Sequence, residues 1–182
     1  MQPTKTLHTL GPQSTDCYRA ALVYERRHPD VDWQLQLHPS FPAVLQAVEQ
    51  DPGAQILLPA ALQLADGTDW GTLHYRYLER WQLVDVFTHP LDPLVLVHSQ
   101  RHTGIVDLHP ATAEVVQHRL PAKTQFRYAP SKWAAYQAYQ RDGEFCVTNQ
   151  ANLQPAETVL KRWQVDMVWT VYQVQEDETC ES

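Results

Sequence analysis

The sequence predicts an α/β fold, because segments typical of strands alternate with segments of helical periodicity along nearly the whole chain. A second observation is that three strand-to-helix connections share one form, in which Pro or a hydroxyl residue separates the strand from the helix. These connections lie at 11–15, 109–112 and 130–132. Third, 43% of the 182 residues are hydrophobic and 19% are charged, which is typical of a soluble globular protein. The alternation favours mostly parallel strand pairing.

The first third of the chain begins with an apolar strand at 5–10 that stops at Gly-Pro. Ser14 and Thr15 stand directly before a helical pattern at 15–27, as helix caps do. The segment "VDWQLQL" at 31–37 alternates apolar and polar residues, as a half-buried strand should. A helix, "FPAVLQAV", is expected at 41–48, and a short buried strand ends at Pro59.

The middle third contains a helical segment at 69–81 and then strands at 81–87 and 93–99 that are rich in branched residues. Another strand is expected at 103–109. A helix at 110–120 follows, with Pro110 in its first turn, where proline is tolerated.

The last third is expected to add strands at 124–129, 144–149 and 165–174. The helix at 130–143 has well-marked ends, with Ser131 as its cap and Gly143 past its last turn. A further helix is expected at 155–163. The end of the chain, 176–182, is expected to be disordered because it is polar and acidic.

Charge and segment composition exclude several classes of function. The net charge is −7 and no basic stripe is visible, so no nucleic-acid partner is expected. No apolar run approaches the roughly 20 residues that span a membrane, and the first residues lack a secretory apolar core. Cys17, Cys146 and Cys180 form neither a metal-binding spacing nor an even disulfide set. A cytoplasmic setting is therefore expected.

Four segments, in order, resemble the catalytic domain of prephenate dehydratases. They are "TLGPQST", "AQILLPAAL", "LHPATAEVVQHRL" and "APSKWAAYQAYQRDGEFCVTNQANL". The resemblance covers about residues 5–175. It implies a type 2 periplasmic-binding-protein-like fold, with two α/β lobes and a ligand cleft between them. The implied lobes are residues 1–93 with 149–175, and residues 94–148.

The departures from the family pattern concern chemistry. Met167, Val168 and Trp169 stand where dehydratases carry Thr-Arg-Phe, and Ala60–Leu62 replace Glu-Asn-Ser. Dehydration needs a donor at the departing hydroxyl, which an apolar wall does not supply. The sequence looks more like the prephenate decarboxylases of bacilysin- and aeruginosin-type pathways, which lack the triplet and keep the hydroxyl. The implied product is a dihydro-4-hydroxyphenylpyruvate. A dehydratase and a non-catalytic binding module of the same fold are the alternatives.

The first candidates for substrate binding are Thr9, Gly11, Pro12, Ser14 and Thr15. Backbone N–H groups and hydroxyls at this helix start could hold a carboxylate, since helix N-termini carry partial positive charge. The alternative is an ordinary capped helix start.

The second group follows later strands. Ser131 and Lys132 open a helix, where Lys132 either faces a pyruvyl carboxylate or is a surface lysine. Thr148 and Asn149 end a strand, where open α/β sheets bind ligands, although such residues also form turns. Arg101 is a weaker candidate for a carboxylate clamp, on its charge alone.

Met167 and Trp169 are expected to line the pocket for the ring, and the alternative is that both belong to the core. No residue is assigned as the catalytic acid, and neither a metal nor a cofactor is expected. The expected ligand is a small dicarboxylate. The six Trp and eight Tyr leave a homodimer or another protein partner as an alternative.

Overall fold

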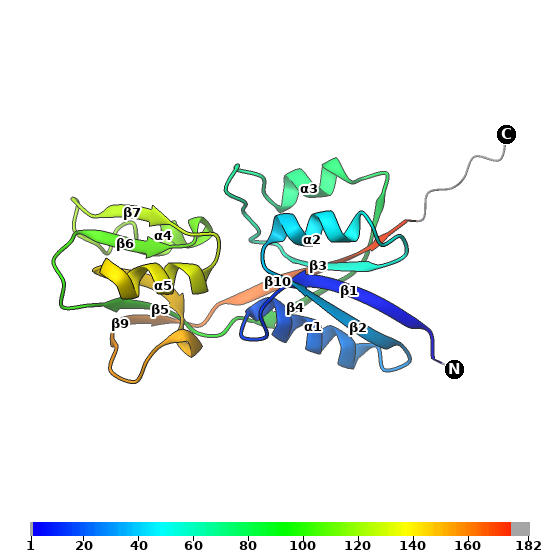
Figure 1. Ribbon diagram of the computed structural model, residues 1–182, viewed down its shortest axis with the longest axis horizontal. Coiled ribbons are helices and arrows are strands. Elements are labelled where there is room, and N and C mark those ends of the chain that lie inside the picture. Colours follow the sequence, from blue (N-terminus) through cyan, green and yellow to red (C-terminus); the bar gives the residue numbers. More distant parts are fainter. Residues whose placement is uncertain (1, 176–182) are drawn as a thin grey trace. The chain divides into compact units, whose positions relative to one another are not determined.

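The computed structural model describes residues 2–175, which divide into two compact units. Unit 1 comprises residues 2–64, 68–89 and 167–175, and unit 2 comprises residues 65–67 and 90–166. Each unit contains a five-stranded sheet with helices (Figure 1). Within the described part of the chain, no helix has the length and apolar character needed to cross a membrane.

Unit 1 is built on a mixed sheet in which β1 lies between two parallel neighbours. Its strands are β1 (Thr4–Leu10), β2 (Asp32–His38), β3 (Gln55–Pro59), β4 (Trp81–Pro90) and β10 (Asp166–Val174), in the order β2-β1-β3-β10-β4. Its helices are α1 (Asp16–Arg27), α2 (Phe41–Val48) and α3 (Trp70–Arg76). Helix α1 lies on one face of the sheet, and α2 and α3 lie on the other (Figure 1). The chain adds β2 on one side of β1 and then β3 on the other side, so the strand order reverses at β1. This makes β1 the switch point of the sheet.

The core of unit 1 forms because alternate residues of β3 and β10 point toward α2 and α3. This core includes Val44, Val48, Ile56, Leu58 and Tyr172. On the other face, fully buried Ala20 and Ala21 of α1 present small side chains toward the interior. The predicted strand and helix segments of the first 60 residues agree closely with these elements.

Unit 2 follows the same plan, with β6 between two parallel neighbours. Its strands are β5 (Leu94–His98), β6 (Ile105–Leu108), β7 (Gln125–Tyr128), β8 (Phe145–Asn149) and β9 (Thr158–Trp163), in the order β7-β6-β8-β5-β9. Its helical segments are η1 (Pro110–Thr112), α4 (Ala113–Val116), α5 (Lys132–Asp142) and η2 (Gln150–Asn152). Strand β5 runs antiparallel to both β8 and β9.

The central strands of the unit 2 sheet, β5, β6 and β8, are buried on both faces. Val116 of α4 packs over Val106 and Leu108 on one face, whereas Tyr136 and Tyr139 of α5 pack over the other. Helix α5 has the predicted ends, since Ser131 caps it and Gly143 follows its last residue. A glycine is required at 143 because a Cβ there would collide with the Asp107 carboxylate and the Tyr139 backbone.

Three expected helices differ in the structure. The helix expected at 69–81 is shorter, since α3 ends at Arg76 and turns continue to Arg80. The prediction of a helix at 155–163 is wrong, because this segment contains β9, which pairs with β5 from Leu94↔Trp163 to His98↔Thr158. The local sequence has good helix formers, but pairing with β5 supplies hydrogen-bond partners that the edge of the sheet otherwise lacks. The helix expected at 110–120 is shorter, since η1 and α4 end at Val116 and a turn continues to Arg119.

The division of the chain also differs from the expected lobes. Unit 2 runs from Pro90 to Asp166, beyond the expected 94–148, because β9 joins its sheet. Strand pairing is mixed rather than mostly parallel, since β5 runs antiparallel to β8 and β9, and β10 runs antiparallel to β3. The tail expected at 176–182 lies outside the described residues. The α/β class itself is confirmed.

Candidate functional site

The carboxyl ends of β1, β2 and β3 meet at one edge of the first sheet, which we call the unit 1 edge. The N–H of Gly11, just after β1, donates to the carbonyl of His38 at the end of β2 (2.8 Å). A Cβ at Gly11 would lie 2.9 Å from that of Leu37, so a close approach of the two backbones requires glycine here. Ala60 donates its N–H to Val168 of β10 (2.9 Å), which brings the start of β10 to the same edge. Ligands of open α/β sheets bind at such edges, beside the switch point.

The loop before α1 carries most of the first predicted group. Thr15 is the N-cap, and its hydroxyl oxygen accepts from the N–H of Tyr18 (3.2 Å). The same hydroxyl donates to the carbonyl of Pro12 (2.8 Å). Pro12 and Ser14 are exposed at the tip of the loop. Thr15 therefore has the structural role of a cap, and binding of an anion by this loop stays a prediction.

The other predicted residues of unit 1 are more buried. The Thr9 hydroxyl is inaccessible to solvent and donates to the carbonyl of Leu57 (3.0 Å). Trp169 is 1% exposed, and its indole N–H donates to the carbonyl of His89 (3.1 Å). Met167 is partly buried at the start of β10. These contacts agree with the core alternative for Trp169, while Met167 lies close to the unit 1 edge.

The remaining predicted residues lie at the corresponding edge of unit 2, where β6, β7 and β8 end. Ser131 accepts a hydrogen bond from the backbone N–H three residues later (3.0 Å) and so caps α5. The buried hydroxyl of Thr148 donates to the carbonyl of Lys132 (2.9 Å), which ties β8 to the start of α5. Asn149 ends β8 and is 4% exposed. His109 caps η1 at the end of β6 through its Nδ1 atom.

The structure therefore gathers the predicted residues at the carboxyl ends of parallel strands, in one group for each unit. A cleft shared by the two groups stays a prediction. The substrate contacts assigned from the sequence to Thr9, Gly11, Pro12, Ser14, Thr15, Ser131, Lys132, Thr148, Asn149, Met167 and Trp169 stay predictions as well.

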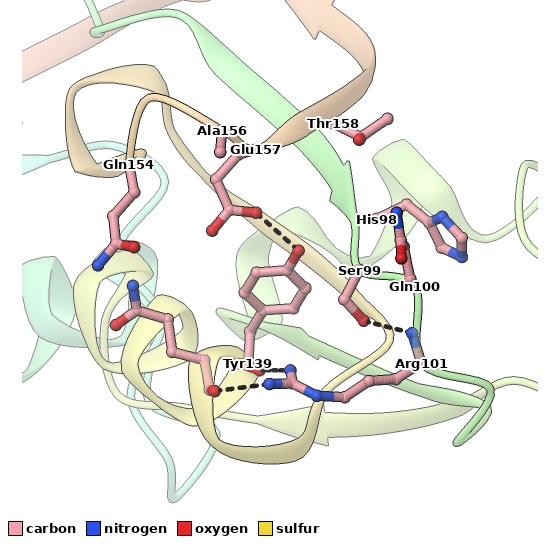
Figure 2. Close-up of a pocket in the computed structure, with 10 residues that line it drawn as sticks. His98, Ser99, Gln100, Arg101, Tyr139, Gln154, Ala156, Glu157 and Thr158 are labelled. Atoms are coloured by element: carbon pink, nitrogen blue, oxygen red, sulfur yellow. Dashed lines mark hydrogen bonds between the residues drawn. The ribbon is translucent and has the colours of Figure 1, made fainter.

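A cavity of about 680 Å³ lies in unit 2, at the edge opposite to the ends of β6 and β8. Its wall includes Tyr139, Glu157 and the end of β5 at His98 (Figure 2). The Glu157 carboxylate accepts hydrogen bonds from the hydroxyls of Tyr136 (3.0 Å) and Tyr139 (2.9 Å). Burial, with the neighbouring Glu157 charge, raises the pKa of Tyr139, so its hydroxyl remains protonated at neutral pH. The sequence carried no signal for this cavity, because β9 was expected to be helical.

The same view corrects the interpretation of Arg101 (Figure 2). Its guanidinium donates to the carbonyls of Tyr139 (2.9 Å), Gln140 (3.0 Å) and Gly143 (3.2 Å). These carbonyls belong to the C-terminal end of α5, where a positive charge is favourable. Arg101 is engaged in holding that end of the helix rather than in clamping a carboxylate.

A cluster that the sequence did not predict lies near the unit 1 edge, and we call it the histidine pair. His8 of β1 and His38 of β2 are hydrogen bonded from Nδ1 to Nε2 (3.0 Å), with nearly parallel rings. The Nε2 atom of His8 lies 3.0 Å from the Asp51 carboxylate. Burial lowers the pKa of His38, and the neighbouring His8 lowers it further. Only the parallel register of β1 and β2 brings these residues together, so no local pattern could have revealed them.

Comparisons with known proteins identify the fold. No family model matches the sequence, and no curated protein matches it. Among solved structures, the prephenate dehydratase of Arthrobacter aurescens, in complex with L-Phe, is 17% identical with a TM-score of 0.59. The match covers 94% of this chain but only 61% of the dehydratase chain.

Two further neighbours are ligand-binding proteins by name. The tungstate ABC transporter of Geobacter sulfurreducens is 8% identical, with a TM-score of 0.56, over 94% of this chain and 85% of that chain. The AmpR effector-binding domain of Citrobacter freundii is 12% identical, with a TM-score of 0.50, over 96% of this chain and 90% of that one. The resemblance to prephenate dehydratases read from the four motifs is thus matched at the level of the fold. The protein has a type 2 periplasmic-binding-protein-like α/β fold.

Proposed function

We propose that the protein binds prephenate and catalyses its non-aromatising decarboxylation to a dihydro-4-hydroxyphenylpyruvate. The fold is shared with a prephenate dehydratase over 94% of the chain, and the four sequence motifs point to the same family. Both kinds of support concern the substrate class. The choice of decarboxylation over dehydration depends on one strand.

The observation that carries this choice is the chemistry at the start of β10. The carbonyl of Val168 accepts a hydrogen bond from the Ala60 N–H (2.9 Å), and the indole N–H of Trp169 donates to the His89 carbonyl. Met167 has no donor. Where dehydratases have a threonine hydroxyl and a guanidinium, Met167 and Val168 have no side-chain donor, and that of Trp169 is already engaged. A substrate held against it would keep its hydroxyl, since expulsion needs protonation or hydrogen bonding.

The carboxyl ends of the parallel strands supply the second requirement, which is recognition of two carboxylates. Each unit offers a helix of at least three turns that starts at such an edge, α1 in unit 1 and α5 in unit 2. N–H groups of a first helical turn favour anions. Lys132 adds a positive charge in the first turn of α5. We therefore propose that N–H groups at these helix starts are the groups that recognise a carboxylate of the substrate.

Incubation of the purified protein with prephenate tests the proposal. The expected result is loss of substrate, release of one carbon dioxide per substrate, and a product that retains the ring hydroxyl by NMR. Phenylpyruvate as the product would instead establish dehydration. Heat-denatured protein is the control for spontaneous, acid-sensitive breakdown of the substrate.

A non-catalytic binding module is the second candidate. The fold likeness to the tungstate transporter and to the AmpR effector-binding domain favours it, because those names describe transport and effector binding. Saturable binding of prephenate by calorimetry, with no product after long incubation, would support this candidate over the enzyme.

A further inference from the structure

The histidine pair and Asp51 form a continuous hydrogen-bonded series through unit 1. Asp51 lies in the turn before β3, its side chain 42% exposed, and His8 lies in the interior of β1, its side chain 6% exposed. His38 ends β2 at the unit 1 edge, partly exposed to solvent. Two 3.0 Å contacts connect the three side chains. The series therefore connects a solvent-facing carboxylate to the edge where a ligand is expected.

The positions of the protons follow from what each atom can accept. The Asp51 carboxylate only accepts, so Nε2 of His8 carries a hydrogen. Nδ1 of a neutral His8 is then an acceptor, and Nε2 of His38 must donate to it. This leaves the lone pair of His38 on Nδ1. A proton added at Nδ1 can be passed on through Nε2 to His8, whose cation is then stabilised by Asp51.

Few other charges act on the pair. Helix α2, which packs against β1 and β2, has no charged residue. Glu49, just after α2, accepts from the Tyr77 hydroxyl (3.0 Å) and lies 4.0 Å from Arg80. Asp32 shares the strand face of His38 but lies six residues away, or about 20 Å along the strand. Lys5 of β1 points to the opposite face by alternation. Asp51 is thus the carboxylate that controls the charge of the pair among the described residues.

We propose that His38 is the proton donor of the decarboxylation proposed above, and that His8 and Asp51 are positioning residues that orient its ring and stabilise its cation. The inference rests on the proposed function. In the step, the bond between ring carbon C1 and the carboxylate breaks and carbon dioxide leaves. The electron pair of that bond forms the C1–C2 double bond. The former C2–C3 π pair then forms a new C–H bond at C3 with the proton from Nδ1 of His38, which becomes neutral. One proton is consumed per turnover, and His38, which is partly exposed, takes it up again at Nδ1 from solvent.

The chemistry of the ligand suits this arrangement. A dianionic substrate brings negative charge to the unit 1 edge, which favours the protonated form of a nearby imidazole. His38 would therefore take up a proton as the substrate binds and would give it up as the carboxylate departs. An acid that is neutral in the empty protein and charged in the complex needs no permanent charge at the site.

The test is the pH dependence of turnover for His38→Gln. The amide nitrogen of glutamine can still donate a hydrogen bond to His8, but it cannot carry the catalytic proton. We therefore expect the variant to remain folded and its KM to stay within about 3-fold of the wild-type value. We expect kcat to fall about 100-fold, because general acid catalysis contributes at least that factor. Asp51→Asn keeps an acceptor for His8 without the charge. It should move the alkaline limb of the kcat profile to lower pH, because a histidine cation without its counter-charge loses its proton more easily.

His102→Gln is the matched control, since it removes an exposed imidazole in unit 2. It should leave kcat and the pH profile unchanged. If the wild-type protein converts prephenate and His38→Gln retains full kcat with an unshifted profile, the inference is wrong while the proposed function stands. If the wild-type protein does not convert prephenate, the proposed function is wrong and this inference falls with it.

Discussion

The two units place three ionisable side chains at matching positions in their sheets. One lies on the central parallel strand, one on its outer parallel neighbour, and one directly before the other parallel neighbour. In unit 1 they are His8, His38 and Asp51, and in unit 2 they are Asp107, Arg127 and Asp142. The same topology therefore holds two imidazoles and a carboxylate in one unit, and a guanidinium between two carboxylates in the other.

The unit 2 set is built as a permanent ion-pair network. Asp107 is inaccessible to solvent, and Arg127 donates to it from Nε (2.5 Å) and from a terminal nitrogen (2.9 Å). The same terminal nitrogen reaches Asp142 at 2.6 Å. This bond lowers the pKa of Asp142, and an arginine does not lose its proton in proteins. The comparison indicates that the unit 2 network serves structure, whereas the unit 1 series contains the imidazole proposed above as a proton donor.

The largest expected effect comes from removing the cation of unit 2. Arg127→Met leaves the Asp107 carboxylate buried without its partner, so the free energy of unfolding should fall by about 3–5 kcal/mol. Denaturant unfolding would measure it, and hydrogen exchange should show the loss in unit 2. Arg162→Met, at an exposed position on β9, is the control and should change little. An equal loss of stability in Arg127→Met and Arg162→Met would contradict the structural role assigned to the network.

The next effect concerns Trp169 of β10, the strand that pairs with β3 in unit 1. Trp169→Phe removes the hydrogen bond to the His89 carbonyl and leaves a cavity, so stability should fall by about 2 kcal/mol. If Trp169 instead lines the ring pocket, the affinity for prephenate will change more than the stability. Calorimetry and denaturant unfolding on the same variant separate these readings.

The helix caps are a matched pair, one for each unit. Thr15→Ala and Ser131→Ala should each cost about 1 kcal/mol, because a side-chain acceptor for a helix N–H is lost. Thr15→Ser and Ser131→Thr keep the acceptor and serve as controls. If the two helix starts also bind the carboxylates of the substrate, the alanine variants should in addition bind prephenate more weakly. Caps without a binding role would leave the affinity unchanged.

The smallest effect is the contribution of His38, in unit 1, to the pH dependence of the free energy of unfolding. Histidine in an unfolded chain titrates near pH 6.5, and the pKa of His38 is lowered in the folded protein. The unfolded chain therefore binds the proton more readily, so His38 contributes a loss of stability as the pH falls below about 6.5. Unfolding curves between pH 7.5 and pH 5 would show a smaller acid-side loss for His38→Gln than for wild type. An unchanged slope would mean that His38 does not titrate as proposed.

Much of the secondary structure was predictable because it depends on short-range chemistry. Helix α5 begins after Ser131 and stops before Gly143, as its caps predicted, and α2 has the expected bounds. Both depend on contacts within a few residues. The segment at 155–163 was mistaken because its partner, β5, lies about 60 residues earlier in the chain. A single edge strand with exposed residues has no burial pattern of its own to reveal it.

The candidate site shows the same limit at the level of side chains. By itself, the sequence determined that hydroxyls and a lysine follow strands, since the order of residues along the chain decides this. It also determined which donors are missing from β10. The tertiary structure alone decided that Thr9 and Trp169 are buried and that His8 meets His38, because these facts depend on strand register. Register is set by pairing between distant segments, and it decides which titratable groups come within hydrogen-bonding distance.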